Sequence, residues 1–285
     1  MTDGRDGVTV LVCTRDRTAM LDDCLSSLAA SMPAGSELLV VAFGDDSAAA
    51  AVEALAVPAR FIRAPQGGKS RQLNLGVREA QHEIIVLTDD DCRVDPSWCA
   101  AMAAPFADPE VGAVFGHVEG LSSVRGARLH ATPAGPAPAV SWAYANGAAM
   151  ALRRAALVDV GGYDERLGPG APVHGEEHDV VLKLQEAGWQ VHIADAPPVR
   201  HLEWRDEAET RENLLVYSRG AGAFIGAALR RHPRRWARTA LRRTRYQAQL
   251  WRHHEQEGWS FGPATSWAYA RGVVHGLLLA PRRYL

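Results

Sequence analysis

The stretch "EIIVLTDDD", residues 83–91, joins a β-forming segment directly to three aspartates. Its apolar run is short and continuous, which is typical of a strand that is buried on both faces of a parallel sheet. Asp89, Asp90 and Asp91 repel one another, and burying them without partners would cost on the order of several kcal/mol. The sequence therefore predicts a central strand that ends at a cation site.

Segments of the same kind recur on both sides of this stretch. Apolar β runs occupy residues 8–14, 36–43 and 60–65 upstream and residues 111–120 downstream. Between them apolar residues recur at helical spacing, as in residues 17–31. This alternation predicts an α/β fold with a doubly wound, mostly parallel sheet and flanking helices.

Polar side chains follow the first strands of this sheet at the point where each strand ends. Thr14, Arg15 and Asp16 follow the first strand, and Asp45 follows the second. Ligands of such sheets bind outside the carboxyl ends of the strands. We therefore expect these residues to share one site with the aspartates at 89–91.

The composition is that of an ordinary globular protein. The 285 residues are 47% apolar and 22% charged, which suits one large domain, or a domain of about 200–220 residues with an extension. The net charge of −2 argues against a nucleic-acid partner. Four cysteines without metal-site spacing, and no long apolar segment, predict a cytoplasmic protein with free thiols.

Five segments, in their order and spacing, resemble the inverting family 2 glycosyltransferases, which have the GT-A fold. They are "VLVCTRDRTAMLDDCLSSL" (10–28), "GGKSRQLNLGVREAQHEIIVLTDDD" (67–91), "NGAAMALRRAALVDVGGYDE" (146–165), "GEEHDVVLKLQEAGW" (175–189) and "PPVRHLEW" (197–204). The resemblance implies a metal-dependent transfer of sugar from a nucleotide-diphosphate sugar to an acceptor hydroxyl. The implied cofactor is Mn²⁺ or Mg²⁺, and the default donor is a UDP-sugar.

The resemblance also assigns roles to the acidic strand end. It implies that Asp91 binds the divalent cation, while Asp89 and Asp90 contact the ribose or the water molecules of the metal. His201 follows a Pro-rich segment, at a position where relatives often complete the metal or diphosphate contacts. A packed or surface histidine is the alternative for His201, and an acidic turn that caps the next helix is the alternative for the aspartates.

The implied nucleotide pocket departs from the family pattern at one point. The loop with Thr14, Arg15 and Asp16 is expected to line the base pocket, although Thr14 also suits a helix cap. Relatives usually carry an aspartate directly after the second strand, where this chain has Ala42. Asp45 or Asp46 is the expected substitute, so GDP and dTDP stay open beside UDP.

The turn "QGGKS" contains Lys69, one of two lysines in the chain. Lys69 and Arg71 are expected to reach the donor phosphates or base, with a surface helix start as the alternative. Trp142 and Asn146 are expected to contact the donor sugar or the acceptor. Core packing explains Trp142 equally well.

The segment "HGEEHD" supplies the expected catalytic base. An inverting transfer needs a group that takes the proton of the acceptor hydroxyl. By resemblance this residue is Glu177, with Glu176 as the competitor. The alternative is acidity that only complements the start of a helix.

The resemblance covers about residues 8–205, so we divide the chain into a catalytic domain, 1–205, and a basic helical extension, 206–285. Within the first, the nucleotide-sugar half is expected at about 1–120 and the acceptor half at about 121–205. The extension is expected to pack on the catalytic domain. Alternatives are peripheral contact of 230–252 with the inner face of an anionic membrane, near a lipid-linked acceptor, and a homodimer interface.

Two other functions compete with the glycosyltransferase. A sugar-phosphate nucleotidyltransferase shares the α/β plan and the need for metal, but its Gly-rich signature is missing from "VCTRDRTAML" (12–21). A noncatalytic nucleotide-sugar binding protein would not need a base such as Glu177.

Overall fold

The structure is a computed structural model that describes most of the chain, namely residues 7–15, 18–44, 47–119, 135–136, 145–171, 173–202, 207–256 and 262–279. The predicted site residues Asp16, Asp45 with its alternative Asp46, and Trp142 lie outside the described residues. The chain forms two compact units. The sheet unit comprises Met1–Glu165 with Glu177–Glu203, and the helical unit comprises Arg166–Glu176 with Trp204–Leu285.

The sheet unit is built on a central eight-stranded sheet in the order β3-β2-β1-β4-β9-β6-β10-β8. Its first four strands are parallel to one another, and β1 lies between β2 and β4. They are β1 (Thr9–Thr14), β2 (Glu37–Ala42), β3 (Ala59–Arg63) and β4 (Ile84–Asp89). The apolar runs therefore predicted these strands correctly.

An antiparallel strand interrupts the parallel arrangement. Strand β9 (Met150–Arg153) lies between β4 and β6 (Val111–Phe115) and runs antiparallel to both. Beyond them, β10 (Gln190–Ile193) is parallel to β6, and β8 (Gly135–Pro136) closes the edge antiparallel to β10. The sheet is thus mostly parallel, as predicted.

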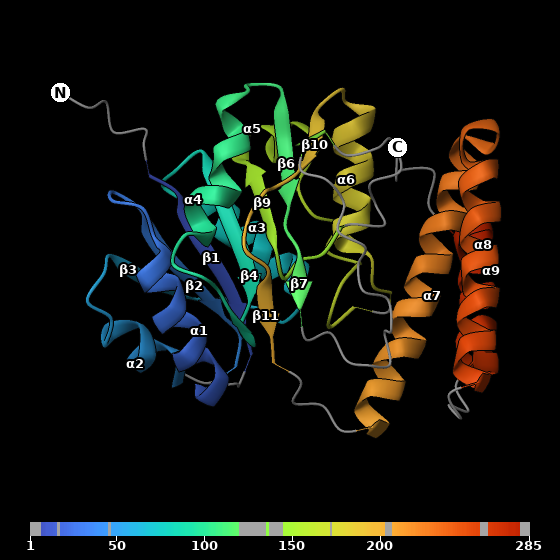
Figure 1. The fold of residues 1–285 in the computed structure, drawn as a ribbon, viewed down its shortest axis with the longest axis horizontal. Helices are drawn as coiled ribbons and strands as arrows, with labels where there is room; N and C mark the ends of the chain where they lie inside the picture. Colours follow the sequence, from blue (N-terminus) through green and yellow to red (C-terminus); the bar gives the residue numbers. More distant parts are fainter. Residues whose placement is uncertain are drawn as a thin grey trace. The chain divides into compact units, whose positions relative to one another are not determined.

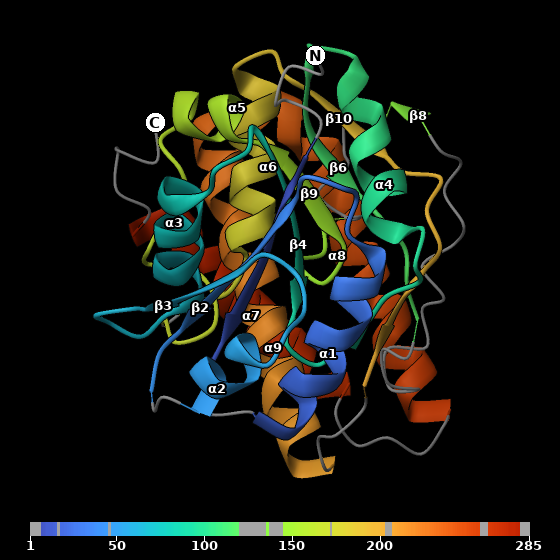
Figure 2. The same cartoon turned by 90° about the vertical axis from the view of Figure 1, so that its left-hand side faces the viewer.

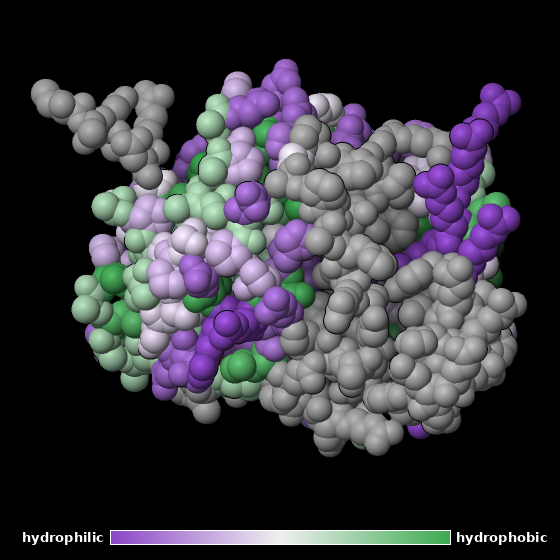
Figure 3. Space-filling view, viewed as in Figure 1, coloured by the Kyte–Doolittle hydropathy of each residue, from purple (hydrophilic) through white to green (hydrophobic). Residues whose placement is uncertain are grey.

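Helices cover both faces of this sheet (Figures 1 and 2). One face carries α1 (Thr18–Ser31), α2 (Ser47–Glu53) and α4 (Trp98–Ala103), which continues as a 3-10 helix (Ala104–Ala107). The other face carries α3 (Lys69–Glu79), α5 (Arg154–Asp159) and α6 (Glu176–Glu186). In Figure 3 the surface on the left mixes hydrophilic and hydrophobic residues, as expected for helices in contact with water.

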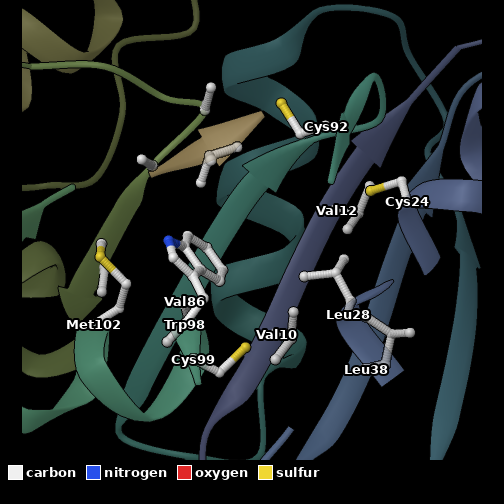
Figure 4. Packing of buried hydrophobic residues seen from close by; sticks show 14 of the residues in the cluster. Val10, Val12, Cys24, Leu28, Leu38, Val86, Cys92, Trp98, Cys99 and Met102 are labelled. Atoms are coloured by element: carbon white, nitrogen blue, oxygen red, sulfur yellow. The ribbon is translucent and has the colours of Figure 1, made fainter. Parts of the chain in front are cut away.

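Two hydrophobic clusters, one on each face, hold the layers together. Alternate residues of a strand point to opposite faces, so Val10 and Val12 of β1 join one cluster and Leu11 joins the other. Figure 4 shows the first cluster around Trp98, whose side chain is fully buried. Such double-sided burial explains why the strands read as unbroken apolar runs.

A second, three-stranded sheet lies beside the acidic strand end. Its order is β5 (Cys92–Arg93), β11 (Val199–His201) and β7 (Val118–Glu119). The predicted strand at 111–120 is therefore two strands, β6 and β7, in two different sheets. The antiparallel pairing of β5 with β11 places His201 opposite Cys92, directly after Asp91.

The described part of the helical unit contains three long helices, which confirms the helical prediction for the C-terminal region. They are α7 (Glu207–Arg231), α8 (Pro233–Gln256) and α9 (Gly262–Leu279). Helices α7 and α9 approach backbone to backbone: a Cβ on Gly222 would lie 2.1 Å from the carbonyl oxygen of Tyr269. None of the described helices has the length and apolarity needed to cross a bilayer.

Candidate active site

The three aspartates at the end of β4 each have a different partner. Asp90 and Asp91 are buried, so their charges need compensation within the protein. The partners come from α3, β1 and β11, three elements that are far apart in the sequence. The contacts are Lys69 Nζ to Asp89 Oδ1 at 2.5 Å, Thr14 Oγ1 to Asp90 Oδ2 at 2.6 Å, and His201 Nε2 to Asp91 Oδ1 at 3.3 Å.

Asp91 and His201 form the core of a candidate metal centre. Together with Cys92 they offer ligand atoms that all lie within 4.8 Å of one another. The side chain of Asp91 is 2% exposed and that of His201 is 12% exposed. The backbone carbonyl of Asp91 accepts the N–H of Leu202 at 2.8 Å, which fixes the turn against the end of β11.

The chemistry of this donor set suits a divalent cation. Carboxylate oxygen is the preferred ligand of Mg²⁺ and Mn²⁺, and imidazole nitrogen is accepted by Mn²⁺. Thiol sulfur suits softer metals than Mg²⁺ or Mn²⁺, so Cys92 is a poor match for the predicted cation. The residues that fit the predicted cation are therefore Asp91 and His201, while Cys92 was not foreseen because a lone cysteine after an acidic run carries no spacing signal.

Lys69 connects the acidic strand end to the second acidic cluster. Its Nζ lies 3.9 Å from Oε1 of Glu177, in addition to its hydrogen bond with Asp89. All three side chains are largely shielded from water, with exposed fractions of 18% for Lys69, 28% for Asp89 and 14% for Glu177. The structure thus brings together two acidic segments that the sequence presented separately.

Local backbone geometry places Lys69 at this point. Helix α3 begins at Lys69, and the preceding Gly68 has φ +124°, a conformation that favours glycine. The sequence predicted Lys69 in a turn before the helix, whereas the residue is the first of the helix itself. The glycine turn therefore aims the first helical side chain at the end of β4.

Gly147 provides the space in which Lys69 and Glu177 meet. A Cβ at residue 147 would lie 2.4 Å from Oε1 of Glu177 and 3.0 Å from Nζ of Lys69. The first distance is shorter than real contacts, so a larger residue here would displace the carboxylate of Glu177. Sequence reasoning missed Gly147, although the dipeptide Asn146-Gly147 is a turn signal.

Asn146 shapes the turn that presents Gly147. Its Oδ1 accepts the N–H of Ala148 at 3.0 Å, and its carbonyl accepts the N–H of Ala149 at 3.2 Å. Thr88 of β4 donates its hydroxyl to the carbonyl of Ala148 at 2.6 Å. The turn is therefore fastened to the strand that carries the aspartates.

The two glutamates of the "GEE" motif have different surroundings. Glu176 is the first residue of α6, is buried, and accepts the N–H of Gly175 with its Oε2 at 3.0 Å. Glu177 belongs to the sheet unit and directs its carboxylate to Lys69 and Gly147. Of the two, Glu177 shares its surroundings with the acidic strand end.

The end of β1 is held by a buried amide. Nε2 of Gln72 donates to the carbonyls of Thr14 and Val41, both at 2.9 Å. The exposed Arg15 follows, with its guanidinium carbon 5.6 Å from the centroid of the Phe43 ring. Phe43, directly after β2, was not among the predicted residues, and its aromatic ring after a strand end was the available signal.

Arg71 lies farther out on the same helix as Lys69. Its Nη1 donates to the carbonyl of Gly67 at 3.0 Å, and its Nε lies 3.5 Å from Oε2 of Glu165. The side chain is 42% exposed. These contacts explain the position of Arg71 without a ligand.

The comparisons with known proteins agree with this architecture. Residues 9–155, just over half of the chain, match the family model "Glycosyl transferase family 2". No curated protein is significantly similar in sequence.

Among solved structures, mannosyltransferase PcManGT from Pyrobaculum calidifontis, in complex with GDP-Man and Mn²⁺, is 19% identical with a TM-score of 0.63. The match covers 95% of this chain and 87% of that chain. Residues 1–349 of S. aureus TarS, in complex with UDP, are 15% identical with a TM-score of 0.57, over 79% of this chain and 71% of that chain. At these identities the likeness establishes a shared fold.

Proposed function

Since this chain belongs to the family 2 glycosyltransferases and has the GT-A fold, we propose that it is a metal-dependent, inverting enzyme. It transfers a sugar from a nucleotide-diphosphate sugar to an acceptor hydroxyl. The observation that carries the proposal is the connection of the acidic end of β4 to Glu177 through Lys69.

Asp91 and His201 are the proposed ligands of Mn²⁺ or Mg²⁺. Their facing ligand atoms, 3.3 Å apart in a nearly buried site, support this assignment. When bound, the cation neutralises the donor diphosphate and makes it a better leaving group. The solved complex of PcManGT with GDP-Man and Mn²⁺, a structure of the same fold, supports the same combination of donor and metal.

The donor ribose and base are proposed to lie at the ends of β1, β2 and β4. Thr14 holds the carboxylate of Asp90, which positions it for a ribose hydroxyl. Asp89 has a second proposed role there, and Arg15 with Phe43 offers an exposed cation and a ring for a base. The UDP-sugar remains our default donor, with GDP- and dTDP-sugars as alternatives.

Glu177 is the proposed catalytic base. In an inverting transfer the acceptor oxygen attacks the anomeric carbon, the bond from that carbon to the diphosphate oxygen breaks, and the acceptor proton passes to the base. The ammonium of Lys69 stabilises the charged carboxylate that this step requires and holds it in one orientation. Gly147 keeps the carboxylate accessible because no side chain fills the space beside Oε1.

The two halves of the catalytic domain are proposed to hold the two substrates. We propose that residues 1–120 hold the donor and residues 121–205 the acceptor, with Asn146 acting through the turn beside Glu177. The four cysteines are free thiols, which favours the reducing cytoplasm as the compartment.

A donor screen tests the function directly. Purified protein is incubated with Mn²⁺ and UDP-, GDP- or dTDP-sugars, with EDTA as the control, and release of the nucleoside diphosphate is measured. We expect turnover with one nucleotide class, loss of it in EDTA, and an inverted anomeric configuration by NMR. Pyrophosphate release from a nucleoside triphosphate and a sugar phosphate would instead support a nucleotidyltransferase, and binding without turnover would support a noncatalytic protein.

A further inference from the structure

Helix α8 exposes a basic face. The segment Pro233–Gln256 contains seven arginines and one glutamate. Arg234, Arg238, Arg242 and Arg245 are exposed and recur at the spacing of one helical face. Trp236 lies on the opposite face, is buried, and packs edge-on against Phe224 of α7 with ring centroids 5.5 Å apart.

Helix α9 exposes an apolar face. Trp267, Val274 and Leu278 are 67%, 53% and 68% exposed, and they recur at intervals of seven and four residues. The opposite face, with Gly272 and Gly276, is in backbone contact with α7. The outer face of a helix in a water-soluble bundle is normally polar, so this face is suited to a partner other than water.

One cation lies on the apolar face and another lies at its C-terminal end. Arg271 is exposed between Trp267 and Val274. At the C-terminal end of α9, Nη1 of Arg230 donates to the carbonyls of Leu277 and Leu278 at 3.3 and 3.2 Å. Helices α8 and α9 contact each other, so the basic and apolar faces belong to neighbouring helices of one unit (Figure 1).

We propose that the helical unit docks on the surface of an anionic lipid bilayer through these two faces. Arginines of α8 attract acidic headgroups, while Trp267, Val274 and Leu278 of α9 enter the boundary between headgroups and acyl chains. A second copy of the chain fits less well, because a symmetric contact between two α8 faces would bring like charges together. Nucleic acid would leave the apolar face in water.

Vesicle flotation tests the proposal with the full-length protein. We expect it to float with phosphatidylcholine vesicles that contain phosphatidylserine, and to float far less with pure phosphatidylcholine or at high salt. The variant R234Q/R238Q/R242Q/R245Q is expected to bind anionic vesicles about 100-fold more weakly. The variant W267S/L278S is expected to bind about ten-fold more weakly at every salt concentration.

Matched controls lie in the sheet unit. Arg78→Gln removes an exposed arginine of α3, and Val158→Ser removes an apolar side chain of α5 that is 67% exposed. Both are expected to bind vesicles as the unaltered protein does. Far-UV circular dichroism of all variants verifies that the helices remain folded.

Two outcomes would overturn the proposal. The first is equal flotation with neutral and anionic vesicles, or none with either. The second is a dimer that W267S/L278S converts to a monomer, because α9 would then be a subunit interface. Glu177→Gln should bind vesicles normally, so the result is independent of whether the proposed transfer reaction is correct.

Discussion

Lys69 and Glu177 meet with 3.9 Å between Nζ and Oε1, although one begins α3 and the other lies in the first turn of α6. The same ammonium lies 2.5 Å from Oδ1 of Asp89. One cation therefore serves two carboxylates that would otherwise repel each other across the site. The contact is the physical basis for treating the two acidic motifs as one site.

Replacing Lys69 by Met should leave Asp89 and Glu177 facing each other without a cation. We expect kcat to fall by about 100-fold or more, because the base loses its charge partner and its orientation. Stability should also fall, by about 1–3 kcal/mol, because two carboxylates that are largely shielded from water lose their charged partner. Steady-state kinetics and thermal unfolding measure both effects.

Arg71→Met is the matched control, because Arg71 lies on the same helix but contacts Gly67 and Glu165. It should retain nearly normal kcat. Wild-type kcat in Lys69→Met would refute the role of the lysine.

Glu177→Gln keeps the size of the side chain and removes its basicity. We expect kcat to fall by about 10²–10⁴-fold while the affinity for the donor changes little. Single-turnover kinetics and calorimetric titration with the donor separate the two. Glu176→Gln is the comparison, since Glu176 bonds the adjacent backbone, and a larger kcat loss there would reassign the base.

Gly147→Ala should act like removal of the base. The added Cβ would occupy a position 2.4 Å from Glu177 Oε1, so the carboxylate or the turn must move. We expect a fall in kcat comparable to that of Glu177→Gln in a folded protein.

Gly161→Ala supplies the control for the backbone effect. Its φ is +80° and a Cβ there would meet nothing within 4 Å, so it should cost about 1–2 kcal/mol of stability without loss of kcat. If Gly147→Ala lowers stability as much as Gly161→Ala does and leaves kcat unchanged, the space beside Glu177 is not required for catalysis.

Asp91→Asn and His201→Gln should weaken metal-dependent nucleotide binding. Each removes a proposed ligand, and we expect a loss of about 100-fold or more in affinity for Mn²⁺ in the presence of the nucleotide. Isothermal titration calorimetry with Mn²⁺ measures this. Asp95→Asn is a nearby control: hydrogen bonds from the backbone and hydroxyl of Ser97 hold the pKa of this exposed carboxyl below its usual value, away from the cluster.

Alkaline pH should destabilise the protein through its buried thiols. Burial raises the pKa of Cys99 to about 11 and that of Cys13 to about 12, from ordinary values near 9. The folded state therefore holds these protons more tightly than the unfolded state. Their contribution to stability is complete below about pH 9 and is lost as the pH rises through about 11 and 12.

Urea unfolding across this pH range measures the effect. The free energy of unfolding should fall less steeply between about pH 9 and 11 in Cys99→Ala than in the unaltered protein. Equal slopes would mean that the thiol of Cys99 ionises as easily in the fold as in the unfolded chain.

The sequence predicted long elements better than short ones. Strands β1, β2 and β4 are buried on both faces and therefore appear as nearly unbroken apolar runs. Strands β5, β7 and β11 have two or three residues, too few for any periodicity. The antiparallel position of β9 between β4 and β6 depends on the path of the whole chain, which no local pattern records.

The candidate site could likewise be predicted only where its residues are contiguous in the sequence. The acidic strand end and the "GEE" motif are contiguous in sequence, so their residue types pointed to them directly. The approach of Lys69 to Glu177, and of His201 to Asp91, arises from tertiary packing between distant segments. The Asn-Gly dipeptide at Gly147 indicated a turn, but only the fold shows that Lys69 and Glu177 lie beside Gly147.

Gln72 has a consequence for redesign of the donor pocket. Its amide group joins the ends of β1 and β2 before any donor arrives, in addition to the backbone hydrogen bond from the N–H of Phe43 to the carbonyl of Thr14. Loops grafted after these strands to alter the choice of nucleobase would therefore start from two strand ends that hydrogen bonds already hold together. A graft that also replaced Gln72 would remove one hydrogen bond from each of these carbonyls, and the ends of the two strands would be held together less firmly.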